Sequence, residues 1–127
     1  MAIIRLMDES DATGKTKALF EEIKAVLQVP FVPELFRALG SHPDRLEAVW
    51  TQVKGLYGAG CLDVKTKLLA ALAVAAVQGN SYFVKIHAIA LKRFGASDEE
   101  ILELLDLAGF SAALDTLVSG LDLEAEL

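Results

Sequence analysis

Apolar side chains recur three or four residues apart along the chain, with polar side chains between them, which is the spacing of amphipathic helices. A first helix begins after Thr13 and carries its charged residues on the face opposite Leu19 and Ile23. The prolines at 30 and 33 end it, because each excludes the preceding residue from the helical conformation. A short helix then runs from Pro33 to Gly40, and a third runs from Pro43 to the glycines at 58 and 60.

Two further helices follow, over 65–78 and from Asn80-Ser81 to Gly95. Asp63 is placed to cap the first of them. This helix is apolar on every side from Leu68 to Val77, and a helix without a polar face must be covered all round. A domain of this size has few elements to provide that cover, so the pattern favours a second subunit packed on this helix.

The last part of the chain opens with a capping box formed by Ser97 and Glu100. We expect the helix that follows to end at Gly109 and a last helix to cover about 111–118. An acidic tail, Leu121–Leu127, completes the chain and is expected to be frayed or docked on a partner.

These patterns predict an all-α fold of about six to seven helices. The chain has 127 residues, which fits one domain spanning 1–127. It is 54% hydrophobic and holds a single cysteine, a composition that excludes a disordered chain and a disulfide scaffold. A helix that crosses a bilayer needs about 20 consecutive apolar residues, and no apolar run in this sequence is that long.

Charge narrows the range of partners. With 18 acidic and 12 basic residues the net charge is -6, which repels nucleic-acid phosphates and anionic lipid. We therefore expect no nucleic-acid or membrane partner. The first residues lack the basic region of a signal peptide, which favours a cytoplasmic location.

His87 is the residue whose chemistry the pattern singles out. It shares a helical face with Phe83, Ala90, Leu91 and Phe94, which predicts that the imidazole points inward. A buried imidazole needs a hydrogen-bond partner, and Tyr82 and Asn80 are the polar groups nearest in sequence.

No metal-ligand spacing is present, so we expect neither a metal nor a cofactor. Cys61 lies outside any thiol motif and is interpreted as a small apolar filler.

Several runs of residues, in order and spacing, resemble the carboxymuconolactone decarboxylase / alkyl hydroperoxidase D superfamily. They are Leu62–Lys65, Gly79–His87 and Gly95–Ile101, with Ala12–Ile23 and Pro33–Leu39 upstream. The resemblance covers the chain from about Ala12 to Gly109. It implies an all-α subunit that assembles into trimers or hexamers, with its site near a subunit contact.

The peroxidase branch of this superfamily carries a Cys-x-x-Cys pair at the start of the fifth helix. It also has a His four residues after the second Cys and a Glu on the preceding helix. Here Asn80 and Phe83 occupy the two Cys positions, and Leu68 occupies the Glu position. Only His87 is kept. Neither an amide nor a phenyl ring attacks a peroxide, so we expect no thiol peroxidase activity.

Three interpretations of function remain open. The first is a homo-oligomer that binds a small aromatic or carboxylated molecule in an apolar pocket around His87, lined by Leu68, Asn80, Tyr82 and Phe83. The second is a decarboxylase-like lyase with His87 as the acid/base group, and Lys85 or Arg93 holding an anion; that branch also lacks the Cys pair while keeping the His. The third is a structural or interaction protein with His87 as part of the core.

Overall fold

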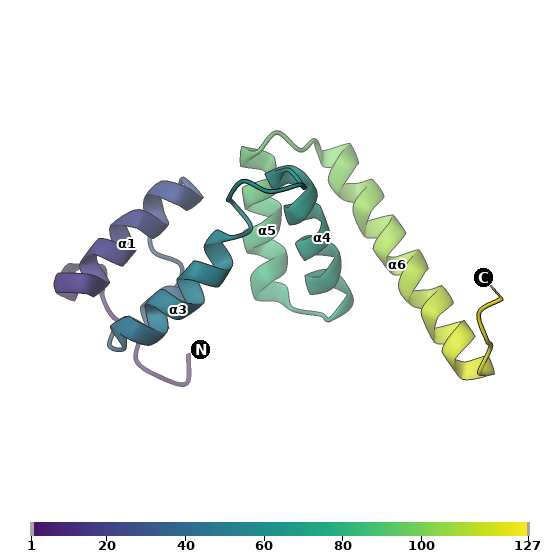
Figure 1. The fold of residues 1–127 in the computed structure, drawn as a ribbon, viewed down its shortest axis with the longest axis horizontal. Helices are drawn as coiled ribbons and strands as arrows, with labels where there is room; N and C mark the ends of the chain where they lie inside the picture. Colours follow the sequence, from purple (N-terminus) through teal and green to yellow (C-terminus); the bar gives the residue numbers. More distant parts are fainter. Residues whose placement is uncertain (1, 127) are drawn as a thin grey trace. The chain divides into compact units, whose positions relative to one another are not determined.

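The computed structural model describes residues 2–126, and every regular element in this range is helical (Figure 1). The elements are the 3-10 turn η1 (Glu9–Asp11) and the helices α1 (Gly14–Leu27), α2 (Glu34–Ala38), α3 (Pro43–Lys54), α4 (Val64–Val77), α5 (Ser81–Arg93) and α6 (Asp98–Leu121). The predicted all-α fold is therefore confirmed. The chain divides into two compact units, Met1–Ala59 and Gly60–Leu127. The single domain spanning 1–127 stays a prediction.

The first unit packs α1 against α3 around one apolar core. Leu19 and Ile23 are buried, as the spacing of apolar positions predicts. Thr13 occupies the N-cap of α1, although its side chain makes no capping hydrogen bond. The buried side chains of this core are Ala12, Leu19, Phe20, Ile23, Leu27, Val32, Phe36, Leu46 and Trp50.

In the second unit, α4 packs against both α5 and α6. Asp63 caps α4 by accepting a hydrogen bond from the Thr66 amide at 2.7 Å. The predicted capping box of α6 is present, with Ser97 and Glu100 each bonding the other's backbone amide. The Lys65 ammonium lies 2.6 Å from a carboxylate oxygen of Glu100, which joins the start of α4 to the start of α6.

Two helix ends differ from the prediction: α3 ends at Lys54, before the predicted glycines at 58 and 60, and α6 ends later than predicted. α6 runs without a break from Asp98 to Leu121, whereas the sequence predicted an end at Gly109 and a separate helix over 111–118. A glycine can end a helix by taking a positive φ, as Gly79 does after α4 and Gly95 after α5. Gly109 keeps helical geometry, at a cost of only about 1 kcal/mol relative to alanine.

The Gly109→Ala variant is expected to be more stable than the wild type by about 0.5–1 kcal/mol. A Cβ built at Gly109 meets no atom within 4 Å, so the methyl group adds helix propensity without a clash. Urea unfolding followed by far-UV circular dichroism measures the difference. Gly79→Ala is the matched control and should destabilise, because its φ of +68° strains any side chain. Loss of stability in Gly109→Ala would contradict a continuous α6.

The acidic tail begins one residue later than predicted, because Leu121 still belongs to α6. Asp122 ends the helix in the left-handed conformation, and Leu127 lies outside the described residues. Docking of the tail stays a prediction. Within the described range, none of the helices combines the length and the hydropathy that a membrane crossing requires.

Candidate functional site

The turn between α4 and α5 sets the position of the candidate site. Gly79 takes a φ of +68°, which lets the chain reverse after α4. Asn80 then caps α5, because its Oδ1 accepts a hydrogen bond from the Phe83 amide at 3.1 Å. Asn80 is exposed, and this oxygen is engaged by the backbone. In the structure, Asn80 thus serves the start of the helix that carries His87.

Three aromatic rings follow one another from the first turn of α5. Tyr82 and Phe83 meet edge to face, with ring centroids 5.2 Å apart and an angle of 85° between their planes. Phe83 and His87 are stacked, at 5.3 Å and 15°. The four-residue spacing places these last two on the same face of α5, one turn apart. The prediction that His87 points inward is confirmed, since only 7% of the residue is exposed.

The imidazole of His87 has an unmet hydrogen-bond requirement. Its Nδ1 is buried and has no hydrogen-bond partner among the residues that the structure describes. Neither Tyr82 nor Asn80 bonds this nitrogen, and the Asn80 oxygen bonds the backbone of α5. A buried polar atom without a partner costs about 1–3 kcal/mol. Burial lowers the pKa of His87 below 6.5, which favours the neutral ring at pH 7.

The other candidate residues differ in their exposure. Leu68 is fully buried on α4. Lys85 and Arg93 are exposed. They lie two residues before and six residues after His87, which places each at least a third of a turn from it around α5. They are thus not on the buried face that holds the imidazole. Cys61 is exposed in the loop before α4, so its interpretation as a buried filler is wrong.

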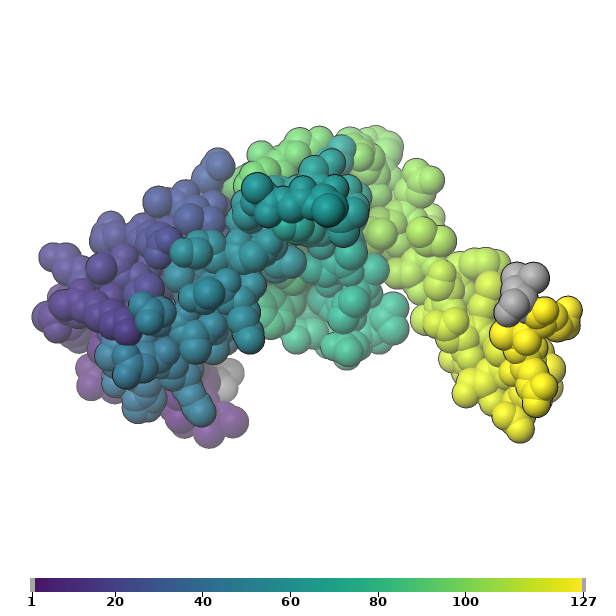
Figure 2. All heavy atoms as spheres, viewed as in Figure 1, coloured from purple at the N-terminus to yellow at the C-terminus, as the bar shows by residue number. Residues whose placement is uncertain are grey.

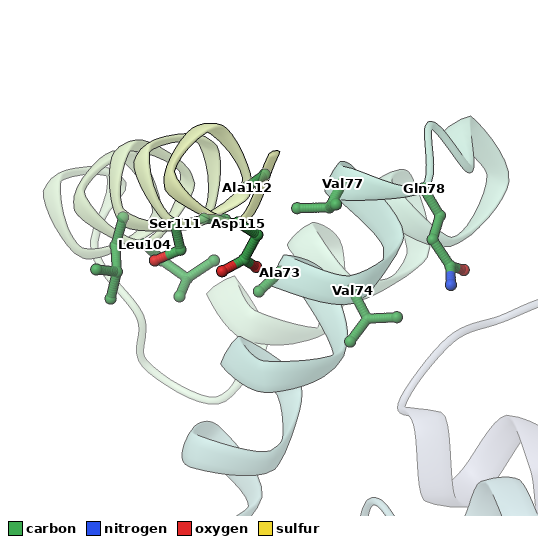
Figure 3. Close-up of a pocket in the computed structure, with 10 residues that line it drawn as sticks. Ala73, Val74, Val77, Gln78, Leu104, Ser111, Ala112 and Asp115 are labelled. Atoms are coloured by element: carbon green, nitrogen blue, oxygen red, sulfur yellow. The ribbon is translucent and has the colours of Figure 1, made fainter. Parts of the chain in front are cut away.

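Sequence reasoning missed a hollow of about 440 Å³ between α4 and the middle of α6 (Figure 3). Its lining is mainly apolar and includes none of the five predicted site residues. The lining residues are Ala73, Val74, Val77, Gln78, Leu104, Leu107, Ala108, Ser111, Ala112 and Asp115. Part of this lining, Ser111, Ala112 and Asp115, follows Gly109, and the predicted break in α6 assigned these residues to a separate short helix.

Within the described residues, fold and site together define an all-helical protein with a buried histidine in the second turn of α5, whose Nδ1 has no hydrogen-bond partner. The sequence model of the carboxymuconolactone decarboxylase family matches residues 43–123. The chain belongs to this family. The predicted family membership is thereby confirmed, and the single cysteine agrees with a member that lacks the Cys-x-x-Cys pair.

One solved structure resembles the whole chain. It is the crystal structure of the alkylhydroperoxidase AhpD core from Rhodospirillum rubrum. The two share 31% sequence identity with a TM-score of 0.91, over 99% of this chain and 95% of the other. The helical arrangement of this chain is therefore that of the AhpD core.

A curated relative shows a more limited similarity. The (R)-2-haloacid dehalogenase of Pseudomonas putida is 32% identical over 72 residues. The matched segment is 53% of this chain and 24% of the dehalogenase, so the similarity spans about a quarter of the relative's length.

Proposed function

We propose that this chain binds a small carboxylate at the buried imidazole of His87 and has no thiol peroxidase chemistry. The observation that carries this proposal is the Nδ1 atom, which is removed from water and lacks a hydrogen-bond partner among the described residues. A ligand that makes a hydrogen bond with this atom removes the free-energy penalty of leaving it unpaired, and this gain adds to the affinity of the ligand.

A carboxylate matches the state of the ring. With its pKa lowered by burial, His87 is neutral at pH 7, and a neutral imidazole can carry its proton on Nδ1. That N–H donates to a carboxylate oxygen, and a bond to an ionised acceptor is stronger than one between neutral groups. The stacked ring of Phe83 supplies an apolar wall beside the imidazole, a combination typical of small-molecule sites.

The relatives support a carboxylate ligand without a redox reaction. By its name, the Pseudomonas putida relative acts on a 2-haloacid, which is a small carboxylic acid with a substituent next to the carboxyl group. The resemblance to the peroxidase branch places Asn80 and Phe83 where that branch has its two sulfurs. The single thiol, Cys61, is exposed on the loop before α4 and has no second thiol with which to form a disulfide.

Small carboxylates, 2-halo acids among them, are expected to raise the melting temperature of the wild type and to raise the pKa of His87. The negative charge favours the protonated ring, whereas burial alone favours the neutral one. Binding therefore takes up protons, and affinity should increase as the pH falls toward the pKa of the free protein. Thermal shift across a panel of acids and NMR titration of the imidazole measure both effects.

His87→Gln should abolish the thermal shift, and His42→Gln is the matched control because the exposed His42 lies in the other compact unit. The proposal fails if no acid in the panel raises the melting temperature of the wild type. That result would favour the structural interpretation, in which the imidazole is part of the core.

A lyase that uses His87 as its acid/base group is the second candidate function. The lowered pKa favours it, because a neutral ring at pH 7 can accept a proton from a substrate. For any substrate found by the ligand screen, His87→Gln should then abolish turnover while the protein stays folded. Unchanged turnover would exclude His87 as the proton carrier.

We further propose that the protein is a homo-oligomer, a trimer or hexamer as the resemblance implies. Val74 and Val77 of α4 support this, because each is more than half exposed on a helix whose only charged side chains are Lys65 and Lys67. Light scattering at micromolar concentration is the direct measurement. The cytoplasmic location and the absence of a nucleic-acid partner stay predictions.

A further inference from the structure

The second half of α6 carries a regular stripe of exposed apolar side chains. Its members follow one another at spacings of three, four, three and four residues. We call them the α6 seam: Leu107, Phe110, Leu114, Leu117 and Leu121, each between 43% and 63% exposed. A 3-4 repeat is the pattern by which one helix packs against another along a shared stripe, with side chains of each helix filling gaps in the other.

The second unit does not cover this seam. α4 lies toward a different face of α6, the face that lines the hollow of about 440 Å³ (Figure 3). Figure 2 shows the end of α6, coloured yellow, standing clear of the α4 and α5 surface of the same unit. Leu107 belongs to both the seam and the lining of the hollow, so the seam is continuous with the exposed Val74 and Val77 of α4.

The size of this surface fits a specific interface. Each seam residue and the neighbouring Val118 leave on the order of 100 Å² of apolar surface exposed, so pairing two such surfaces removes roughly 1,200 Å² from water. That area lies within the range of stable protein interfaces. An exposed apolar patch of several hundred Å² on one chain marks an interaction surface.

The distribution of charge along α6 favours a second copy of this chain as the partner that covers the seam. From Leu107 to Leu121 the only charged residue is Asp115, which lines the hollow, and α6 has no Lys, Arg or His. Asp98, Glu99 and Glu100 precede the seam, and acidic residues of the tail follow it. An anionic membrane would be repelled by both ends. The uncharged seam has no charges that would attract a charged helix of another protein. The seam of a second copy, in contrast, has the same length and the same hydrophobicity.

We propose that the α6 seam packs against the α6 seam of a second copy of this chain, around a two-fold axis. This inference rests on the proposed self-association and names its surface. A two-fold contact joins subunits in pairs, so it requires an even number of copies, such as a hexamer rather than a trimer.

The test combines light scattering with one double variant and one single-residue control. Leu114→Glu together with Leu117→Glu places two charges in the middle of the seam and should weaken association by ~100-fold or more. Leu102→Glu is the matched control, because Leu102 is 61% exposed on α6 but lies off the seam, and this variant should keep the wild-type mass. Far-UV circular dichroism verifies that each variant is folded.

Disulfide cross-linking is a second measurement, and it does not require the Leu114→Glu, Leu117→Glu variant to fold. Leu114 is the middle residue of the seam. A two-fold axis through the seam therefore brings the two copies of position 114 together, whether the two α6 helices run parallel or antiparallel. Leu114→Cys in a Cys61→Ser background should form a disulfide between copies under mild oxidation, and Leu102→Cys in the same background should not.

The outcomes separate the two proposals. An even-numbered wild type whose mass falls in the seam variant supports the seam. A wild type that associates but is unaffected by the seam variant, fails to cross-link at position 114, or contains three copies overturns the seam and leaves self-association standing. A wild type that is monomeric throughout the concentration range overturns both.

Discussion

Replacing Leu68 with Glu is expected to destabilise the protein by about 3–5 kcal/mol. Leu68 is fully buried in α4, and an unpaired carboxylate at such a position pays the full cost of leaving water. Burial raises the pKa of an introduced carboxyl, so the loss should be smaller at pH 5 than at pH 8. The midpoint of urea unfolding, followed by far-UV circular dichroism at both pH values, gives the result.

Leu68→Met is the matched control, because it conserves volume and polarity and should cost less than about 1.5 kcal/mol. The comparison bears on function, since the resemblance places a glutamate of the peroxidase branch at this position. A Leu68→Glu variant as stable as Leu68→Met would mean that the carboxylate finds a partner or water there. Position 68 would then accept the glutamate of the peroxidase branch, although the two Cys positions of that branch would still hold Asn80 and Phe83.

The same variant tests the prediction of one domain. Trp50 is the only tryptophan and lies in the first compact unit, while Leu68 lies in the second. A single cooperative domain requires Trp50 fluorescence and circular dichroism to shift together in Leu68→Glu. A fluorescence midpoint that stays at its wild-type value would mark two independently folding units.

Trp50→Ala is expected to cost about 3–5 kcal/mol, the second large effect. Trp50 is 1% exposed, and its ring meets Phe36 edge to face at 5.5 Å. Its Nε1 donates to Glu22 Oε2 at 3.2 Å, and Glu22 Oε1 lies 2.9 Å from the Lys54 ammonium. Truncation leaves a cavity in the core and removes one of the two partners of Glu22. Urea unfolding followed by circular dichroism measures the loss.

Two variants separate the contributions to that loss. Trp50→Phe keeps most of the apolar contact but not the indole N–H, so it should lose distinctly less than Trp50→Ala. Lys54→Met removes the half-exposed ion pair and should cost less than about 1 kcal/mol, because solvent screens such pairs. If Lys54→Met costs as much as Trp50→Ala, packing is not what holds this core.

Helix starts could be predicted because their signals are local. Asp63 bonds an amide three residues ahead of it, and Ser97 and Glu100 bond each other's backbone, so sequence spacing alone contains the interaction. The end of a helix at a glycine is different. Gly95 takes a positive φ and Gly109 does not, and the two are the same residue type in the sequence. Residue type alone therefore does not decide whether a glycine ends a helix.

The candidate site was predictable only in part. The helical period predicted the inward direction of His87 and the face that it shares with Phe83, because both depend on the spacing along α5 alone. Whether Nδ1 finds a partner depends on residues distant in sequence, and proximity to Tyr82 and Asn80 was a poor guide. The α4–α6 hollow was missed because its lining on α6 extends past Gly109, beyond the predicted end of the helix.

The stack of His87 on Phe83 has a spectroscopic consequence. Protons held over the face of a phenyl ring lie in the shielding zone of its circulating electrons, so the carbon-bound imidazole protons of His87 should resonate upfield of those of an exposed histidine. The chain has two histidines, and His42 is exposed. The displaced pair of signals can therefore be assigned to His87 without mutagenesis, and any molecule that separates the two rings would return those signals toward their ordinary positions.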